Sequence, residues 1–207
     1  MSAQSRYLAF LINGVRQELG DEDPANFTWQ EHELVSHIQK ALRDLSRVAP
    51  YERKSTLQTV ASKDVDISTL TPRVLSYGKK GILKVEFPTG GTPEEYRNFE
   101  VWGDTLTLKL DHTPAAGKDV NIWWAQFHEV TTTSTTLTPD TEDIVMGGAC
   151  ASALMTWGQA HLNDVNVGGA SVASQMVTMG ITKLGLFRQA LDRLRPILMT
   201  QEYDEGA

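Results

Sequence analysis

Apolar residues recur every three to four positions near the start of the chain, the spacing that places them on one face of a helix. Residues 5–19 carry one such face, and residues 29–49 carry a second. Thr28 and Glu31 have the spacing of a capping box at the start of the second stretch, and Pro50 disfavours helical geometry in the residue before it. The pattern therefore predicts two amphipathic helices in the first fifty residues.

The stretch from Thr138 to Leu162 predicts a third helix, with Thr138 as N-cap and Pro139 at the first helical position. Between Ile144 and Trp157 no side chain is charged. A helix that is apolar all round is normally buried all round. Small residues make this helix thin, and we expect close packing of another backbone at Gly147, Gly148 and Ala151.

A fourth helix is predicted over Val172–Arg195, and Pro196 is expected to end or kink it. Three arginines lie near its C-terminal end, where the helix dipole favours cations. The tail that follows, Thr200–Ala207, is polar and acidic. We expect this tail to be disordered in the free chain.

Between the second and third helices the apolar period changes to two, which is typical of strands with one solvated face. Gly103-Asp104 predicts a turn, so the strands on either side of it should form a hairpin. The residues from Val120 to Val130 are apolar on both faces, which indicates a central strand or one that faces a partner. The expected strands are 83–87, 99–102, 105–110 and 120–130, with weaker ones at 56–60 and 73–77.

These elements predict an α+β fold, a bundle of about four helices with an antiparallel β module inserted between helices 2 and 3. Residues 1–52 and 137–207 would form the helical core, and 53–136 the inserted β module. The threonine- and serine-rich residues 131–136 would be the linker that leaves the module.

The chain has 207 residues and a net charge of −7, which argues against a general nucleic-acid binder. The charge does not exclude a protein that surrounds DNA without gripping it. The single cysteine, Cys150, lies in the apolar helix, where we expect a buried, inert thiol. No signal peptide or membrane span is expected, and one cysteine permits no internal disulfide.

No catalytic, metal or cofactor site is expected. His32 and His37 are five residues apart, one too many for the two histidines of a zinc helix to share a face. The stretch 89–92 lacks the ending of a phosphate-binding loop, and there is no nucleophile elbow. Clear patterns for helices and strands, together with the lack of a catalytic or metal-binding motif, favour a structural or interaction protein that works in a larger assembly.

Three stretches together resemble the head–tail adaptor (connector) proteins of tailed bacteriophages. The first is Trp29–Arg47, which ends near Pro50. The second is Val85–Gly90 with Phe99–Leu108, and the third is Leu137–Val145 with the small-residue helix after it.

The resemblance implies a ring, usually of twelve copies, below the portal protein of the capsid. Such a ring belongs to the neck of the virion, after synthesis in the host cytoplasm. It lengthens the DNA channel, through which DNA passes without specific binding, and it presents a platform for the tail or for a stopper or terminator protein. Smaller adaptors lack so large a β insertion, whose role is open between outer decoration, neighbour contact and tail platform.

In such proteins the helices build the ring and the C-terminal segment often docks against the portal. The portal-docking residues implied here are Arg188, Arg193, Arg195, Thr200, Gln201, Glu202, Tyr203, Asp204 and Glu205.

Three other functions stay open. One alternative is a β-sandwich binding module, for example for glycans, on a helical stalk, with Trp102, Trp123 or Trp124 as its platform. A second is a related tail-completion or stopper protein, which only its position in the particle would distinguish. An enzyme comes third, and would need a polar pocket that the sequence does not assemble.

Overall fold

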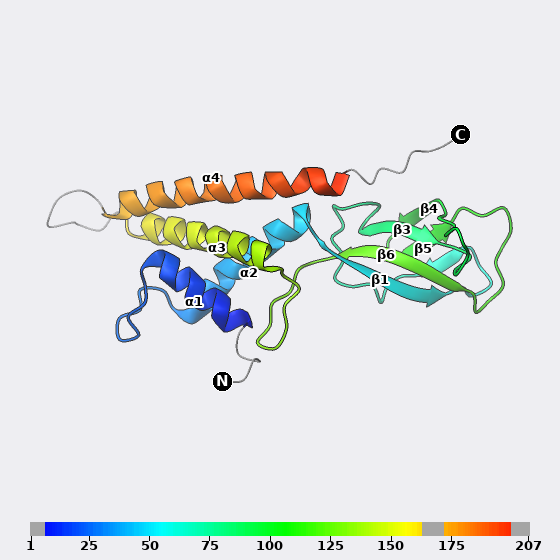
Figure 1. Cartoon of the computed structure of the whole chain (residues 1–207), viewed down its shortest axis with the longest axis horizontal. Coiled ribbons are helices and arrows are strands. Elements are labelled where there is room, and N and C mark those ends of the chain that lie inside the picture. The colour runs from blue at the N-terminus through cyan, green and yellow to red at the C-terminus, as the bar shows by residue number, and fades with distance from the viewer. Residues whose placement is uncertain (1–6, 163–171, 200–207) are drawn as a thin grey trace. The chain divides into compact units, whose positions relative to one another are not determined.

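The computed structural model describes residues 7–162 and 172–199, the last five of these by backbone alone. These residues form four helices and six strands, and the strands lie between the second and third helices in sequence (Figure 1), which confirms the expected fold class. The helices are α1 (Tyr7–Leu19), α2 (Glu31–Val48), α3 (Pro139–Ala160) and α4 (Val172–Met199). The strands are β1 (Tyr51–Gln58), β2 (Asp64–Asp66), β3 (Ile82–Glu86), β4 (Phe99–Trp102), β5 (Thr105–Leu108) and β6 (Asp119–Gln126).

The chain divides into a helical unit and a β module. The helical unit comprises Met1–Ala49 and His128–Ala207, and the β module comprises Pro50–Phe127. The expected module, 53–136, was therefore too long at its C-terminal end. Residues after 127 belong to the helical unit because they are bonded to it: the backbone N–H of Leu8 donates to the Thr131 carbonyl at 3.2 Å.

His128 links the segment that follows the β module to the end of α2, the element that precedes the module. Its backbone N–H donates to Ser46 Oγ at 2.8 Å, and its Nε2 lies 2.9 Å from the carbonyl oxygen of Ala49. Its Nδ1 lies 3.0 Å from Thr136 Oγ1. The segment expected to be a free linker is thus a short turn fastened to the end of α2.

The core of the helical unit is built from one face of each helix. Leu34, Ile38 and Leu45 of α2 are fully buried, and Val145 of α3 and Phe187 of α4 join the same cluster. Helices α3 and α4 run side by side in opposite directions (Figure 1). Burial of α3 among the other helices accounts for its lack of a polar face.

Helix α2 begins two residues later than its sequence suggests. Its N-cap is Gln30, whose N–H donates to Glu33 Oε2 at 2.7 Å, so the expected capping box at Thr28 is wrong. The reason is Asp21, which accepts the backbone N–H of Thr28 at 2.7 Å and keeps this stretch out of the helix. The start of α3 is confirmed, with Thr138 as N-cap and Pro139 in the first turn.

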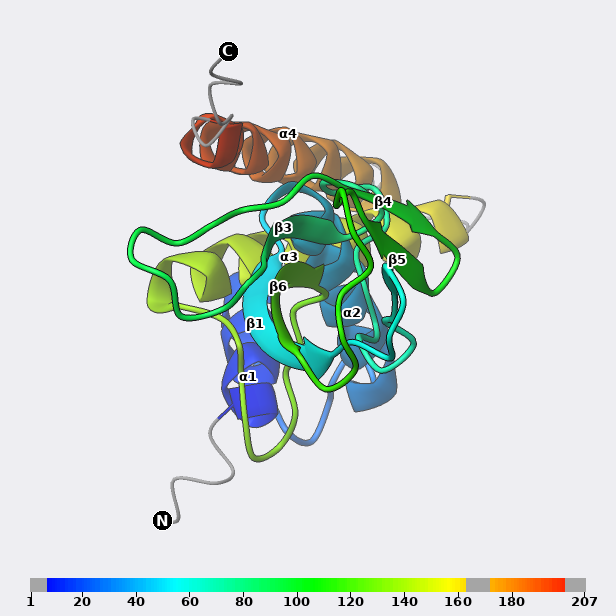
Figure 2. The ribbon, with the colours of Figure 1, turned by 90° about the vertical axis from the view of Figure 1, so that its right-hand side faces the viewer.

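The β module contains two three-stranded antiparallel sheets, with strand orders β1-β6-β3 and β2-β5-β4. Figure 2 shows β6 between β1 and β3, and β4 beside β5. The expected hairpin across Gly103 is present as β4 and β5, and Gly103 takes the positive φ of 57° that its turn requires. A separate core of buried side chains, including Val65, Ile82, Leu106 and Ile122, lies within the module.

Two element predictions were wrong. Residues 73–77 make only an isolated bridge between Arg73 and Gln126 instead of a strand. Helix α4 continues through Pro196 to Met199, so this proline does not end it, and the alternative expectation of a kink there stays a prediction. Over the described residues, no helix combines the length and the apolar character needed to cross a membrane.

Candidate assembly surfaces

Helices α3 and α4 approach closely where glycines leave room. A Cβ added to Gly148 would lie 2.7 Å from the Phe187 ring, and one added to Gly180 would lie 3.1 Å from the carbonyl oxygen of Ala151. Gly158 is similar, with the Ala173 carbonyl oxygen at 2.8 Å from its added Cβ. Two of the three expected packing residues, Gly148 and Ala151, therefore lie at a helix–helix contact.

Gly147, the third expected packing residue, lies elsewhere. A Cβ added to Gly147 would meet no atom of a neighbouring element within 4 Å, and Gly185 on α4 is equally open. The close approach expected at Gly147 is absent within the described chain. A mid-helix glycine costs about 1 kcal/mol against alanine, so Gly147 lowers helix stability without serving this contact.

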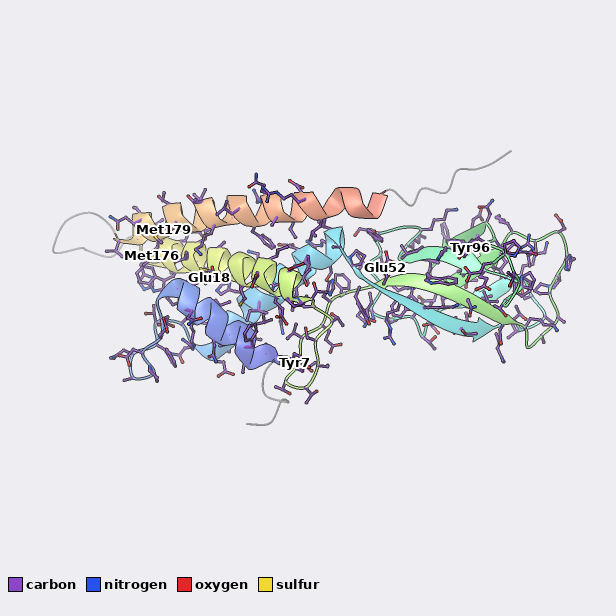
Figure 3. All side chains as sticks on the ribbon, viewed as in Figure 1. Tyr7, Glu18, Glu52, Tyr96, Met176 and Met179 are labelled. Carbon is purple, nitrogen blue, oxygen red and sulfur yellow. The ribbon has the colours of Figure 1, made fainter. Side chains whose placement is uncertain are left out.

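Helix α4 carries an apolar stripe on its exposed side. Val172, Met179 and Leu186 are 46 %, 52 % and 61 % exposed and are spaced seven residues apart, two helical turns each. Figure 3 labels Met179 and its neighbour Met176, which packs against the helical core instead. We name Val172, Met179 and Leu186 the α4 stripe. Exposed apolar surface of this kind marks contacts with other molecules.

The residues expected to dock on the portal divide between described and undescribed parts of the chain. Arg188 and Arg193 are exposed on the last turns of α4. The backbone of Arg195 is helical. The remaining expected residues, Thr200 to Glu205, lie outside the described residues.

The reactive residue types are used structurally. His37 Nδ1 lies 3.1 Å from Ser152 Oγ, and burial lowers the pKa of this imidazole. His161 stacks on Trp157 at a centroid distance of 4.2 Å. Burial raises the pKa of the Cys150 thiol to about 11, so the thiol stays protonated and unreactive. The described residues contain no group of three side chains that could hold a metal ion.

One face of the β1-β6-β3 sheet carries a row of charged and aromatic side chains. Lys54, Trp123 and Lys84 are directly opposite one another on the three strands. Each lysine Nζ lies 4.4 Å from a Trp123 ring centroid, and Tyr96 meets the same ring edge-on at 5.9 Å. Figure 3 labels Tyr96 within the β module. The lysines take the positions at the Trp123 ring that a stacking ligand would need.

The next row of the same face contains a buried carboxylate. Glu86 is 2 % exposed and accepts hydrogen bonds from Asn121 Nδ2 at 2.8 Å and from the Gly90 backbone N–H at 3.0 Å. Asn121 in turn accepts a bond from Thr56 Oγ1 at 2.7 Å. These hydrogen bonds lower the pKa of Glu86, with a smaller contribution from Lys54 at 3.8 Å.

The tryptophans proposed as a ligand platform differ in exposure. Trp124 is 3 % exposed, and its indole N–H donates to Ser55 Oγ at 3.0 Å, so it is a core residue and cannot be a platform. Trp102 is 84 % exposed at the end of β4. Lys80 Nζ lies 4.8 Å from the Trp102 ring centroid.

Two surfaces were not singled out from the sequence. Helical periodicity revealed the buried face of α4 but not the α4 stripe, whose seven-residue spacing is itself visible in the sequence. A groove on the helical unit, described below, joins residues from α1, the α1–α2 loop and α3, and no local pattern signals it.

No family model matches this sequence, and a search of curated proteins found no match.

Proposed function

We propose that the chain is a head-to-tail adaptor of a tailed bacteriophage, which assembles as a ring under the portal and extends the DNA channel towards the tail. The observation that carries the proposal is the helical unit itself. It joins the two ends of the sequence around α3 and leaves an apolar stripe on α4 for a neighbour. Each subunit of a closed ring contacts a neighbour on either side and therefore needs surfaces left free for those contacts.

The three stretches that carry the resemblance fall on elements of the expected type. The first covers α2 as far as Arg47, the second covers the end of β3 together with β4 and β5, and the third covers the start of α3. Helices α2 and α3 pack in one core, so two of these stretches belong to the unit that the proposal assigns to the ring.

The charge distribution also supports the proposal. The β module holds ten basic and ten acidic residues and is neutral. The helical unit holds the remaining nine basic and sixteen acidic residues, and so carries the whole net charge of −7. Twelve copies would place about −84 on the helical ring, and an acidic channel wall repels phosphates and lets DNA slide.

The test is to mix the protein with portal rings of the same phage and to image the mixture by electron microscopy. The proposal expects added ring-shaped density below the portal. Portal rings that look the same with and without the chain would contradict it. The location of the density also separates an adaptor, which touches the portal, from a tail-completion or stopper protein, which lies further along the neck.

The docking role of the C-terminal end has its own test. Reversing the exposed arginines with Arg188→Glu and Arg193→Glu, or deleting Thr200–Ala207, should weaken co-sedimentation with portal rings without unfolding the helical unit. Arg43→Glu, an exposed arginine on α2, is the matched control. Unchanged co-sedimentation of both test variants would remove this end of the chain from portal docking.

One observation favours a glycan-binding module as the second candidate. Trp102 is highly exposed, as a sugar-stacking platform must be. The exposed ring should then show a fluorescence shift on titration with oligosaccharides, and Trp102→Ala should abolish that shift. A chain that binds portal rings and shows no such shift would favour the adaptor.

A further inference from the structure

Trp102 lies at the tip of a hairpin that is held in place. The Arg73 guanidinium donates to Asp104 Oδ1 at 2.5 Å and to the Gly103 carbonyl at 3.4 Å, which fixes the turn directly after Trp102. Among the large apolar side chains of the described residues, none is more exposed than Trp102. An exposed aromatic ring on a fixed backbone loses little entropy on binding, which suits it to anchor a protein contact.

The helical unit offers a groove that fits such an anchor. The groove has a volume of about 450 Å³, enough for an indole ring. Phe10 of α1, Phe27 of the α1–α2 loop and Met146 of α3 supply its apolar wall. The Met146 side chain packs over Gly14, where an added Cβ would overlap the methionine sulfur. The two phenylalanines are 41 % and 36 % exposed, although both are large and apolar. We name this site the α1 groove.

The charges beside the two surfaces are complementary. Lys80 lies over the Trp102 ring, and Glu22 lines the α1 groove. Arg16 also lines the groove, but its guanidinium is already paired with Asp21 and lies over the Phe27 ring. Within the described residues, neither the Glu22 carboxylate nor the Lys80 ammonium group makes a hydrogen bond or an ion pair, and Lys80 Nζ lies over the Trp102 ring. The α1 groove also belongs to the unit that carries the net charge of −7. The positively charged Lys80 beside Trp102 therefore favours docking of this tip on the acidic helical unit over docking on the neutral β module.

We propose that Trp102 of one copy inserts into the α1 groove of a second copy, with Lys80 of the first paired to Glu22 of the second. The proposal rests on the proposed ring, and it assigns the β module to neighbour contact. The two surfaces differ, so the contact is head-to-tail, and each copy can both give and receive a tip. Repetition of such a contact closes into a ring or extends as a filament.

Crosslinking tests the contact in the full-length chain. A Lys80→Cys, Glu22→Cys double variant, treated with a short bis-maleimide, should give a ladder of dimers, trimers and larger species. A mixture of the two single variants should stop at dimers, because each copy then has only one reactive end. Cys150 is buried and protonated, so it stays in place. Lys109→Cys combined with Glu22→Cys, a lysine of the same module away from the tip, is the control.

Each outcome bears on the proposal. A ladder in the test variant and none in the control supports it. No crosslink, a crosslink within single copies only, or an equal ladder in the control would overturn it.

Sedimentation measures the strength of the same contact. Trp102→Ala should weaken self-association about thirtyfold, the effect of losing an interface anchor. Val60→Ala removes an apolar side chain that is 73 % exposed on the same module and should leave self-association unchanged. Lys80→Glu should weaken it about tenfold, and adding Glu22→Lys should restore it. If the Lys80→Glu, Glu22→Lys double variant self-associates as weakly as Lys80→Glu alone, the pairing of Lys80 with Glu22 is contradicted.

The outcome also separates this inference from the proposed function. Portal rings that acquire adaptor density with Trp102→Ala as readily as with the wild type would refute the tip contact and leave the adaptor standing. A crosslinked ladder from a chain that never binds portal rings would support the tip contact and contradict the proposed adaptor function.

Discussion

At the scale of single residues, the α1–α2 connection depends on one buried ion pair. Arg16 Nη1 lies 2.5 Å from Asp21 Oδ2, and the two side chains are 9 % and 3 % exposed. Asp21 also accepts the Thr28 N–H, and Arg16 also donates to the Trp29 carbonyl at 3.0 Å. Each side chain thus neutralises the charge of the other and also forms a hydrogen bond with the backbone of the loop.

Asp21→Ala should therefore lower the free energy of unfolding by about 3 kcal/mol, because it leaves the buried Arg16 charge without its anionic partner. Urea denaturation followed by circular dichroism measures the loss. Asp44→Ala breaks an exposed ion pair with Arg47 and should cost less than about 0.5 kcal/mol. Equal effects of the two substitutions would show that the buried pair adds nothing.

Glu86 gives the β module a pH-dependent stability. Its pKa in the folded chain lies below the ordinary value of 4.5, chiefly because Asn121 and the Gly90 N–H bond to the carboxylate. A carboxyl group with a lowered folded pKa stabilises the fold above its unfolded pKa. That contribution is lost as the pH falls through the folded pKa.

Glu86→Gln should therefore destabilise the chain by about 1 kcal/mol at pH 7, and this difference should shrink towards zero as the pH falls below 4.5. Thermal unfolding between pH 3 and pH 7 measures it. Glu100→Gln, at an exposed carboxylate, is the control and should show little difference at either end. A Glu86→Gln deficit that stays constant with pH would contradict the assigned hydrogen bonds.

At the scale of elements, the α3–α4 pair offers a matched comparison of glycines. Gly180→Ala should destabilise the helical unit by about 2 kcal/mol, because the added Cβ would lie 3.0 Å from the Met155 backbone nitrogen. Gly185→Ala meets no atom within 4 Å and should stabilise α4 by up to about 1 kcal/mol. Equilibrium unfolding of both variants measures the difference. If the two substitutions shift stability in the same direction, the close packing of α3 on α4 is wrong.

Elements whose signals are local could be predicted from the sequence. Thr138 and Pro139 begin α3 as expected, and Gly103 forms the turn between β4 and β5. The start of α2 was missed because Asp21, seven residues before Thr28, competes for its N–H. The end of α4 was missed because a proline signal alone does not determine where a packed helix ends.

The candidate site was less predictable for the same reason. Lys54 and Trp123 are neighbours only because β1 pairs with β6, and the two residues are far apart in sequence. The α1 groove likewise joins Phe10 to Met146. Such juxtapositions depend on the tertiary fold, whereas Gly148, in a helix of visibly small residues, was identified from composition alone.

At the scale of the whole molecule, the β module is an insertion whose two ends are adjacent. Tyr51 pairs with Gln126 across β1 and β6, and the carbonyl of Ala49 is 2.9 Å from His128 Nε2. Each unit also has its own buried core. Because each unit has its own core and the two connecting segments are adjacent, the helical unit and the β module should fold independently.

Replacing residues 50–127 with a short glycine–serine linker should therefore leave a helical unit that still unfolds cooperatively. Far-ultraviolet circular dichroism during a thermal ramp measures this, and residues 50–127 alone should give a cooperative β-type transition. A linker variant that behaves as an unfolded chain would show that the helical ends need the module, and would remove the two-unit description.

The adaptor account is tested most directly by the mass of the assembly that the chain forms with portal rings. Native mass spectrometry of the chain alone, of portal rings alone and of their mixture gives the number of copies bound. The account predicts a closed complement of copies on each portal ring, twelve where the portal has twelve subunits. Portal rings that keep their own mass, or that bind one or two copies without completing a ring, would contradict it.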